Sequence, residues 1–518
     1  MILRRRVPRP FAALAIALFL AVALVPLTAT SARAATPICL SGALEYDFLN
    51  AEEGPSKPLR SKWARAAGVE LWGNEKPTDA PRLLASGLTR TDNGGFDLCY
   101  TPTTTTMMSA LWVRFNAQYL NLWKVTDNSG RLYTFDTPPR TNVSASTNLG
   151  TVKAPAAGSR AWHAFDTVLD LYTSRTNDVS RCWTAKETDN NACTGVTIHW
   201  GEESRGTGFN EGIIQLSGAD PDSQHVTLHE LGHFFMWVLY GRTFPTVTNC
   251  QPHYVNRASS DTCAWTEGFA DAVSTYVSAE YPPRYVFNDG GSIELTYGSG
   301  WGVGDTVQGN VAGSLIDLSY YHDAGWDRTI NVLAWKRPST FAEYFNLARP
   351  GAYPPLATTG PVLDKLLKHA IDYGPTIIGD GKYHTFTNGS GLALEHAEGC
   401  SIPRDASNVY LAPLDTSRPQ QRWKVDPNPD GTVTITDGCP TPLVLTQMGN
   451  SQSYVTARPA YRNPSDKTWK VTKANGTLRF TDPWGYSALD TPGGVYSGAT
   501  VTVKSVGSAN SQSWVAMP

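Results

Sequence analysis

The sequence lacks several features, and each absence excludes a class of protein. After Val25 no apolar run is long enough to cross a bilayer, which takes about 20 residues, so we expect no membrane span in the mature chain. The net charge is −3 over 518 residues, which argues against nucleic acid as a partner. No two cysteines have C-x-x-C spacing, which argues against a cysteine zinc site.

The N-terminus has the pattern of a secretory signal peptide. A positive end, Arg4-Arg5-Arg6, precedes an apolar run from Phe11 to Val25, and Ala32-Arg33-Ala34 is a small-x-small cleavage site. We expect residues 1–34 to be this signal and the mature product to be secreted into the extracellular space.

All eight cysteines lie beyond the signal, and an even number in an exported chain predicts disulfides. Eight cysteines allow about 105 connectivities. Nearest-neighbour pairing keeps every bond inside one of the domains described below. We therefore expect the pairs Cys39–Cys99, Cys182–Cys193, Cys250–Cys263 and Cys400–Cys439.

The stretch from Asp222 to Trp237 contains the motif His229-Glu230-x-x-His233. On a helix the two histidines lie one turn apart on the same face, so both imidazoles can reach one ion, and Glu230 lies beside them. The alternative is a chance motif on a helix surface. The flanking residues favour a buried helix, because most of them are apolar. Zn²⁺ suits this set of ligands.

A third ligand is required, and the H-E-x-x-H-x-x-G-x-x-H type is excluded because Met236 and Leu239 occupy the positions it needs. The next candidate is a second predicted helix around Trp265 to Tyr276. Glu267 and Asp271 lie one turn apart on it. Glu267 can complete the zinc site, and Asp271 can accept the free N–H of a ligand histidine. The alternative is an exposed helix edge.

His229-Glu230-x-x-His233 followed by Glu267-x-x-x-Asp271 resembles the gluzincin metallopeptidases, the thermolysin-like clan. The resemblance covers two helices, and the spacer between them is longer than in thermolysin and holds two cysteines. It implies a zinc endopeptidase acting on protein or peptide substrates, with Glu230 as general base. It also implies an oxyanion donor, for which a third predicted helix, Gly309 to Asp323, offers Tyr320, Tyr321 or His322.

Two further positions near the motif have more than one interpretation. In gluzincins the strand before the histidine helix borders the cleft, so Ile213 to Ser217 would pair with substrate by resemblance; an ordinary core strand is an equal alternative. His225 extends the histidine run at the same spacing. It can be a competing ligand, but a helix-start residue with local hydrogen bonds is the favoured interpretation.

Residues 35–149 alternate apolar and polar residues between turns, as in Gly68 to Trp72 and Ala110 to Phe115, which predicts strands. This pattern resembles the transthyretin-like or immunoglobulin-like sandwiches attached to secreted enzymes. Two roles remain open for this domain: an accessory or partner-binding role, and that of an inhibitory pro-region. Residues 150–376 then form the expected catalytic domain.

Residues 377–518 contain a repeat with a period of about 45 residues, marked by Gln421-Arg422-Trp423, Lys467-Thr468-Trp469 and Gln512-Ser513-Trp514. The repeats resemble the Q-x-W units of ricin-type lectins, a β-trefoil, although the second repeat has Lys in place of Gln. The resemblance implies a sugar site at Asp490, Asn510 and Gln512. In the third repeat, the position at which that family has an aromatic platform falls near Lys504, which is not aromatic. The fold is therefore better supported than the sugar site.

The sequence thus predicts a multidomain protein: an N-terminal β-sandwich, an α+β zincin-like catalytic domain and a C-terminal β-trefoil that binds glycans. The function expected is a secreted zinc endopeptidase. Two alternatives remain open, namely a peptidase restricted to glycoproteins and a secreted carbohydrate-binding protein with an inactive or structural zinc site.

Overall fold

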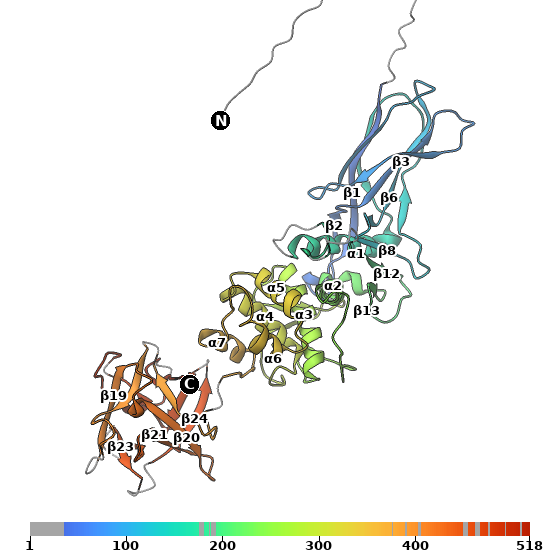
Figure 1. The fold of residues 1–518 in the computed structure, drawn as a ribbon. Coiled ribbons are helices and arrows are strands. Elements are labelled where there is room, and N and C mark those ends of the chain that lie inside the picture. Colours follow the sequence, from blue (N-terminus) through green and yellow to red (C-terminus); the bar gives the residue numbers. More distant parts are fainter. Residues whose placement is uncertain are drawn as a thin grey trace, which may run out of the picture.

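The computed structural model describes residues 36–517, except 176–180, 186, 188–192, 375–376, 389–390, 402–405, 449–453, 461–466, 475–476, 493 and 508–509. The predicted signal, residues 1–34, therefore lies outside the described residues. Figure 1 shows a strand-rich region at one end, a helical region in the middle and a second strand-rich region at the other end. No helix among the described residues has the length and apolar character that a membrane span requires.

The front of the molecule is a sandwich of two sheets. The rings of Phe96 and Phe115, one from each sheet, meet edge-on with centroids 5.2 Å apart. The first sheet contains β1 (Ile38–Leu49), β2 (Leu59–Trp63), β5 (Gly95–Tyr100) and β11 (Thr147–Lys153). The second contains β3 (Gly68–Asn74), β4 (Arg82–Leu88), β6 (Met108–Asn116), β9 (Thr134–Asp136) and β10 (Arg140–Val143).

A third sheet crosses the position where the sequence predicts a domain boundary, between residues 149 and 150. Its order is β13-β14-β12-β8-β7, and β8 pairs in parallel with β12. Trp123 of β8 is buried against Phe165 of the first helix, with ring centroids 6.0 Å apart. The strands are β7 (Gln118–Tyr119), β8 (Trp123–Thr126), β12 (Val196–His199), β13 (Gly208–Asn210) and β14 (Ile213–Gln215).

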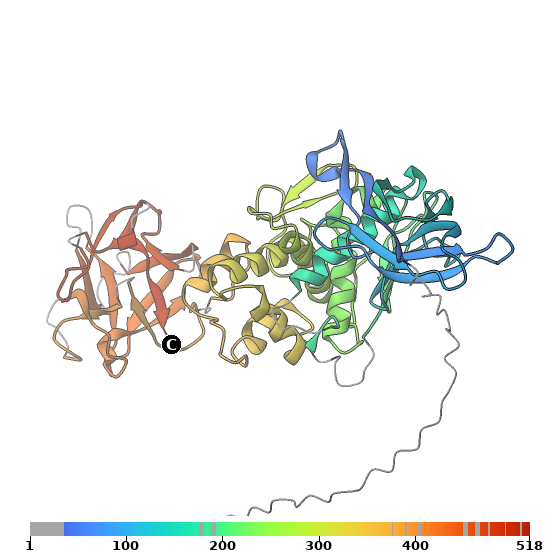
Figure 2. The same cartoon turned by 90° about the horizontal axis from the view of Figure 1, so that it is seen from above.

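The helical region follows this sheet. Helix α2 packs against both α1 and α3, and α3 packs against α4. Figures 1 and 2 show these helices between the two strand-rich regions. The helices are α1 (Ser159–Ser174), α2 (Gln224–Leu239), α3 (Asp261–Val277), α4 (Gln308–Tyr321), α5 (Trp326–Lys336), α6 (Phe341–Glu343) and α7 (Pro361–Lys368), with a π-helical turn, η5 (Tyr344–Ala348). The strands β15 (Arg284–Val286) and β16 (Ser292–Glu294) form a small hairpin.

One continuous hydrophobic core joins the sandwich to the helices. It runs from Ile38 of β1 to Ile371, just after α7. Polar contacts reinforce the junction: Glu52, in the short 3-10 turn η1 (Ala51–Glu53), accepts a hydrogen bond from the backbone N–H of Gln224 at 2.6 Å. Lys57 also forms an ion pair of 2.8 Å with the buried Asp222. The front sandwich is therefore part of the structural unit that contains the His229 motif.

The C-terminal region has a core of its own, from Ile377 to Trp514. Its three motif tryptophans are fully buried. Each indole N–H donates to the carbonyl of a leucine in the same repeat: Trp423 to Leu394 at 2.9 Å, Trp469 to Leu445 at 2.9 Å and Trp514 to Leu489 at 3.2 Å. This threefold recurrence agrees with the expected β-trefoil.

The described residues of this region form twelve strands. They are β17 (His384–Thr387), β18 (Leu392–His396), β19 (Ser407–Pro413), β20 (Arg422–Pro427), β21 (Val433–Asp437), β22 (Leu443–Gln447), β23 (Val455–Pro459), β24 (Thr468–Ala474), β25 (Thr477–Thr481), β26 (Ser487–Asp490), β27 (Thr502–Ser505) and β28 (Val515–Met517). In the second repeat the ammonium group of Lys467 donates to the carbonyls of Pro459 and Ala460, so Lys467 occupies the place of the motif glutamine.

The structure contains four disulfides, and they join the four nearest-neighbour pairs predicted from the sequence. Cys39 and Cys99 face each other directly on the paired strands β1 and β5. No described cysteine is free.

Candidate active site

Helix α2 carries the histidine motif. Ser223 caps its start, accepting the N–H of Val226 at 3.2 Å, and Gly241 follows its last turn with φ +69°, a conformation that favours glycine. His229 and His233 are each only 7% exposed, because apolar residues surround the helix on most sides. The helix therefore places two imidazoles, one turn apart, inside the protein.

Helix α3 begins at its cap Ser260 and lies close against α2. Gly232, between the two histidines, makes this contact possible: a Cβ there would lie 2.7 Å from the Cα of Ala270. Gly268 has the same role toward α4, where a Cβ would lie 2.7 Å from the carbonyl oxygen of Gln308. These two close approaches bring one face of α3 to the histidines.

The structure brings His229, His233 and Glu267 together. The Nε2 atom of His229 lies 3.1 Å from Nε2 of His233 and 3.1 Å from Oε2 of Glu267, and the third edge of the triangle is 3.4 Å. Tetrahedral zinc at about 2.0–2.1 Å from each ligand places its donor atoms roughly 3.3 Å apart. The three side chains thus have the donor types and spacing that fit zinc, with a fourth position left for water or substrate.

Asp271 and Gln308 lie directly behind this triangle. Nδ1 of His229 lies 2.8 Å from Oδ1 of Asp271, and Nε2 of Gln308 donates to Oδ2 of Asp271 at 3.0 Å. The contact with Asp271 leaves Nε2 of His229 directed toward the other two donors. Orientation of a ligand histidine by a carboxylate is a common feature of metal sites.

Opposite charges dominate the electrostatics of the triangle. Burial alone would lower the pKa of His229, but Asp271 and Glu267 raise it well above the usual value. Burial alone would raise the pKa of Glu267, but His233 and His229 lower it well below the usual value. Both pKa shifts are those of the protein without a bound metal ion. They indicate that His229 and Glu267 stabilise each other's charged forms.

Glu230 lies beside the triangle and outside it. Burial raises the pKa of its carboxyl group, and the charges of His229 and His233 oppose that rise. Its Oε2 is buried and has no hydrogen-bond partner among the described residues. A buried, unpaired carboxylate oxygen is costly for folding, and such groups concentrate at functional sites.

A cleft of 1020 Å³ opens over these residues. The cleft wall includes His229, Glu230, His233 and Glu267, and also the strand β13. Aromatic side chains form much of the remaining wall: Phe209 of β13 contacts both Trp237 and Phe244, with ring centroids 5.9 and 6.0 Å apart. The cleft is therefore polar at the ligand triangle and apolar beside β13.

Of the two interpretations that were open for Ile213 to Ser217, the structure favours the ordinary core strand. Ile213 to Ser217 includes β14, which pairs in parallel with β12 on one side and antiparallel with β13 on the other. Both edges of β14 are therefore occupied. β13 is the last strand in the order of this sheet, so it provides the edge, and Gly208 to Asn210 replace Ile213 to Ser217 as the candidate substrate-pairing strand.

The three predicted oxyanion donors do not reach the site, which corrects that prediction. Tyr320 and Tyr321 end α4 and His322 follows it, whereas Gln308 at the other end contacts Asp271. Twelve residues of helix separate the two ends, or roughly 18 Å. Tyr320 is 67% exposed and stacks on Tyr281, so it belongs to an outer surface.

His225 does not join the triangle. Its Nδ1 lies 3.3 Å from Oε1 of Glu52, which also accepts the backbone N–H of Gln224. His225 thus lies in the first turn of α2, as expected, but its side chain contacts the distant Glu52 and is not held by the local hydrogen bonds that the sequence favoured. Among the described residues two other clusters have possible metal ligands, around Cys99 and Cys439, but their cysteines are in disulfides and cannot supply thiolates.

Several residues of the site were not predicted from the sequence. Gln308, His253 and Tyr285 line the cleft, and Nδ1 of His253 lies 2.9 Å from Oε1 of Gln308. His253 had a signal in the sequence, since it stands between two cysteines just before the helix of Glu267. Gln308 and Tyr285 had none, because their approach depends on how separate elements pack.

In the C-terminal region, Gln512 donates to Oδ2 of Asp490 at 2.8 Å, and both residues are buried. Oδ1 of Asp490 is buried with no partner among the described residues. The corresponding carboxylate of the first repeat, Glu395, is already bound by Arg418, Gln421 and Tyr410. The side chain of Asn510 lies outside the described residues.

Comparison with solved structures finds low similarity. A mosquitocidal holotoxin is 18% identical in sequence. The match covers 26% of this chain and 17% of the holotoxin chain, with a TM-score of 0.23. The designed 3-fold symmetric protein ThreeFoil is 20% identical over 26% of this chain and 98% of its own, with a TM-score of 0.23. A Macrolepiota procera ricin B-like lectin, solved in complex with lactose, is 16% identical; the match covers 26% of this chain and 94% of the lectin chain, with a TM-score of 0.22. These likenesses support no conclusion about this chain.

Comparison with protein families is more informative. No curated protein matches the chain. Residues 39–161 match the family model described as the Mycolysin middle domain, and residues 175–370 match that of the Mycolysin C-terminal domain. The first match covers the front sandwich together with the start of α1, and the second covers the histidine motif and Glu267. Because the match to the middle domain is followed by the match to the C-terminal domain, residues 39–370 of this chain form a mycolysin-like peptidase region.

Proposed function

We propose that this protein is an exported zinc endopeptidase. One observation carries the proposal: three donor atoms, from His229, His233 and Glu267, lie 3.1–3.4 Å apart in a cleft beside a buried carboxylate with an unpaired oxygen. The mycolysin-like region supports the peptidase part. The four disulfides favour an oxidising compartment such as the extracellular space.

In this proposal His229, His233 and Glu267 would hold the zinc, and Asp271 would keep His229 oriented. Zinc, when bound, supplies Lewis acidity toward water and toward a peptide carbonyl. Glu230 accepts the proton that the attacking water loses and delivers it to the nitrogen of the leaving amine. The raised pKa of Glu230 suits both steps, because a carboxyl group with a pKa nearer to neutral is a better proton donor as well as an acceptor.

The substrate would bind as an extended chain along β13. The outer edge of this strand offers backbone hydrogen-bond groups, and an added strand would run across the cleft toward Glu230. The aromatic wall of Phe209, Trp237 and Phe244 beside it favours peptides with apolar side chains there. The C-terminal region would bind glycans and hold the enzyme near glycosylated material, raising its local concentration.

The test is metal content and casein cleavage of the mature chain compared with Glu230→Gln. This substitution keeps the three ligands and removes the base, so we expect about one zinc per chain in both proteins and a loss of kcat of at least about 10²-fold in the variant. Chelation of the wild-type protein should abolish cleavage, and added zinc should restore it. If both proteins hold zinc and neither cuts casein or a glycoprotein, the alternative of a binding protein with a structural zinc is correct.

A further inference from the structure

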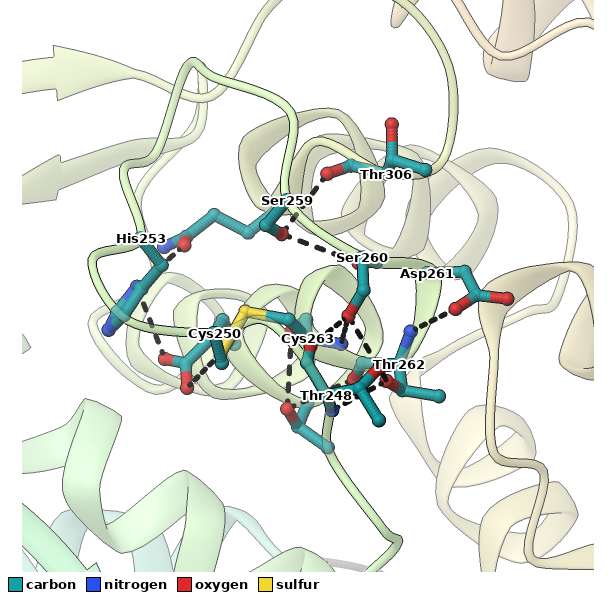
Figure 3. The surroundings of a disulfide bond; sticks show 12 residues. Thr248, Cys250, His253, Ser259, Ser260, Asp261, Thr262, Cys263 and Thr306 are labelled. Atoms are coloured by element: carbon teal, nitrogen blue, oxygen red, sulfur yellow. Dashed lines mark hydrogen bonds and ion pairs between the residues drawn. A yellow bond between two sulfur atoms is a disulfide. The ribbon is translucent and has the colours of Figure 1, made fainter.

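The loop between α2 and α3, residues 241–260, carries an arginine at its start. Arg242 lines the cleft, and no other arginine or lysine among the described residues lines it. Figure 3 shows the disulfide Cys250–Cys263, which ties the middle of this loop to the start of α3. The one arginine side chain in the described cleft wall is therefore on a loop that is fastened to the helices on both sides.

The end of α2 fixes the backbone of Arg242. The N–H of Gly241 donates to the carbonyl of Val238 at 2.9 Å. The N–H of Arg242 donates to the carbonyl of Trp237 at 2.8 Å. Together these bonds form a Schellman motif, which ends a helix in a defined conformation. The side chain of Arg242 therefore begins from a fixed position.

One nitrogen of the Arg242 side chain is held against the third sheet. Nε donates to Oγ1 of Thr194 at 3.0 Å, and Thr194 is only 7% exposed. The backbone of Thr194 is held on both sides, because its N–H donates to Glu187 at 2.8 Å and its carbonyl accepts the indole N–H of Trp183 at 3.1 Å. This anchor limits the positions that the guanidinium group can take.

The remaining donors of the guanidinium group are available to a ligand. The group has five N–H donors and stays positively charged at every working pH. Among the described residues only its Nε has a partner, and none forms an ion pair with Arg242. Glu211 also lines the cleft but is not paired with Arg242. The planar group matches a carboxylate, which can accept two parallel hydrogen bonds.

The anchor of Arg242 lies at one end of the proposed substrate-pairing strand β13. A Cβ on Gly212, two residues after β13, would lie 3.4 Å from the carbonyl oxygen of Gly195. Gly195 directly follows Thr194 in the sequence. The end of β13 at Asn210 is therefore close to Arg242, and a peptide paired with β13 would pass this arginine.

The length of α2 sets the separation between Arg242 and the ligand triangle. From His233 to Leu239, the last residue of α2, the helix rises roughly 9 Å. An extended peptide advances about 3.4 Å per residue. A substrate side chain that reaches Arg242 therefore belongs to a residue roughly two to four positions from the peptide bond at the triangle.

We propose that Arg242 is a specificity-determining residue, which binds an acidic side chain of the substrate roughly two to four residues from the bond that is cut. This inference rests on the proposed peptidase function and names a class of substrate for it. The aromatic wall contacts apolar side chains of the peptide, and Arg242 binds a carboxylate farther along the chain. Because Arg242 lies outside the triangle, it affects which peptides are cut and takes no part in bond cleavage.

The experiment compares Arg242→Glu and Arg242→Gln with Arg337→Glu in the zinc-loaded full-length mature chain. Arg337 is the matched control. It also follows a helix with a left-handed backbone, φ +50° against +66° for Arg242, and it does not line the cleft. The substrates are quenched peptides with Glu, Gln or Lys placed two, three or four residues from the cut bond, on either side of it. The quantity measured is kcat/KM, with zinc content and melting temperature recorded in parallel.

For the wild-type chain we expect kcat/KM to be about five- to tenfold higher for the Glu peptide than for the Gln peptide at one of these positions, because the bond to a carboxylate is charge-assisted but partly exposed to solvent. Arg242→Gln should lose this preference, and Arg242→Glu should prefer the Lys peptide. Arg337→Glu should keep the wild-type preference. Zinc content should be the same in all four proteins.

Three outcomes overturn the inference. Equal kcat/KM of the wild-type chain for Glu, Gln and Lys peptides at every position would show that the cleft binds no carboxylate. An acidic preference that persists in both Arg242 variants would assign it to another residue. An equal reversal in Arg337→Glu would show a general effect of net charge. A wild-type chain that holds zinc and cuts neither these peptides nor casein overturns the proposed function itself, which distinguishes that failure from the first three.

Discussion

The two junctions of this protein differ in kind. At the first, the front sandwich and the helical region share one hydrophobic core, one sheet and the contact of Glu52 with the start of α2. At the second, the C-terminal region has a separate core, and an ion pair of 3.0 Å between Lys473 and Asp372 spans the connection. The first junction is internal to a folding unit, whereas the second joins two units.

This difference bears on the role of the front sandwich. A pro-region that is removed must leave behind a catalytic unit that is complete. Removal of residues 35–149 would take β8 out of the third sheet, would expose the apolar face of α1, and would take away the carboxylate that holds the start of the histidine helix. The structure therefore favours a permanent part of the peptidase unit over a removable inhibitor.

The largest effect expected from this comparison is that of deleting the front sandwich. A chain that begins at residue 150 loses strand β8 from the third sheet and one side of the shared core. We expect it to lack a cooperative thermal transition and to be insoluble or rapidly degraded. Differential scanning calorimetry and circular dichroism measure this. A soluble, zinc-binding fragment with a sharp transition would show that the two regions fold independently.

An intermediate effect is expected for Glu52→Ala. The substitution leaves the backbone N–H groups of Gln224 and His225 without their shared acceptor, so the free energy of unfolding should fall by about 1–3 kcal/mol. Glu53→Ala is a matched control, because Glu53 is exposed and pairs with Arg60 on the surface. It should leave the melting temperature unchanged. An equal melting temperature for wild type and Glu52→Ala would argue that the start of α2 does not depend on the sandwich.

The stabilisation by Glu52 should also depend on pH. Burial raises the pKa of its carboxyl group, but the hydrogen bond and charge of His225 outweigh burial, and the net direction is downward. The folded pKa is thus below the unfolded value of about 4.3, so the stabilisation is present above that pH and is lost as the pH falls through the folded pKa. The difference in stability between wild type and Glu52→Ala should therefore shrink under acid conditions.

The smallest effect on the peptidase unit is expected from removing the C-terminal region. A mature chain that ends at residue 374 keeps the whole first core, so its melting transition and its kcat/KM on a short peptide should equal those of the full chain. Residues 377–518 expressed alone should fold. A loss of peptide cleavage in the shortened chain would show an interaction between the two units that the cores do not reveal.

The sequence predicted what depends on local spacing. The i, i+4 spacing of His229 and His233, and of Glu267 and Asp271, placed each pair on one helix face, and both helices are present. Nearest-neighbour pairing of cysteines gave the four disulfides because each closes a contact within one unit. The recurrence of the motif tryptophans gave the three repeats of the C-terminal region.

The predictions that failed depend on how elements pack at long range. Periodicity predicted helix α4 but could not indicate which of its ends faces the histidines, so Tyr320 was chosen and Gln308 was overlooked. For β14 the sequence left a cleft-bordering strand and a core strand equally open, because the short β13 that covers its edge has no alternating pattern to mark it. The predicted boundary between residues 149 and 150 separates β8 from β12, which are neighbours in one sheet. This pairing joins strands that are far apart in the sequence, so spacing along the chain could not indicate it.

The contact between Glu52 and the start of α2 also constrains the order in which this chain folds. Glu52 and Gln224 are 172 positions apart, and the side chain of Arg284, a further 60 positions on, donates to the carbonyl of Glu52. Contacts of such large sequence separation form late, because the intervening chain must first lose its freedom. During synthesis Glu52 is made early, and its carboxylate and carbonyl gain these two partners only after Gln224 and Arg284 have emerged. The start of the histidine helix therefore reaches its final contacts only at a late step of folding.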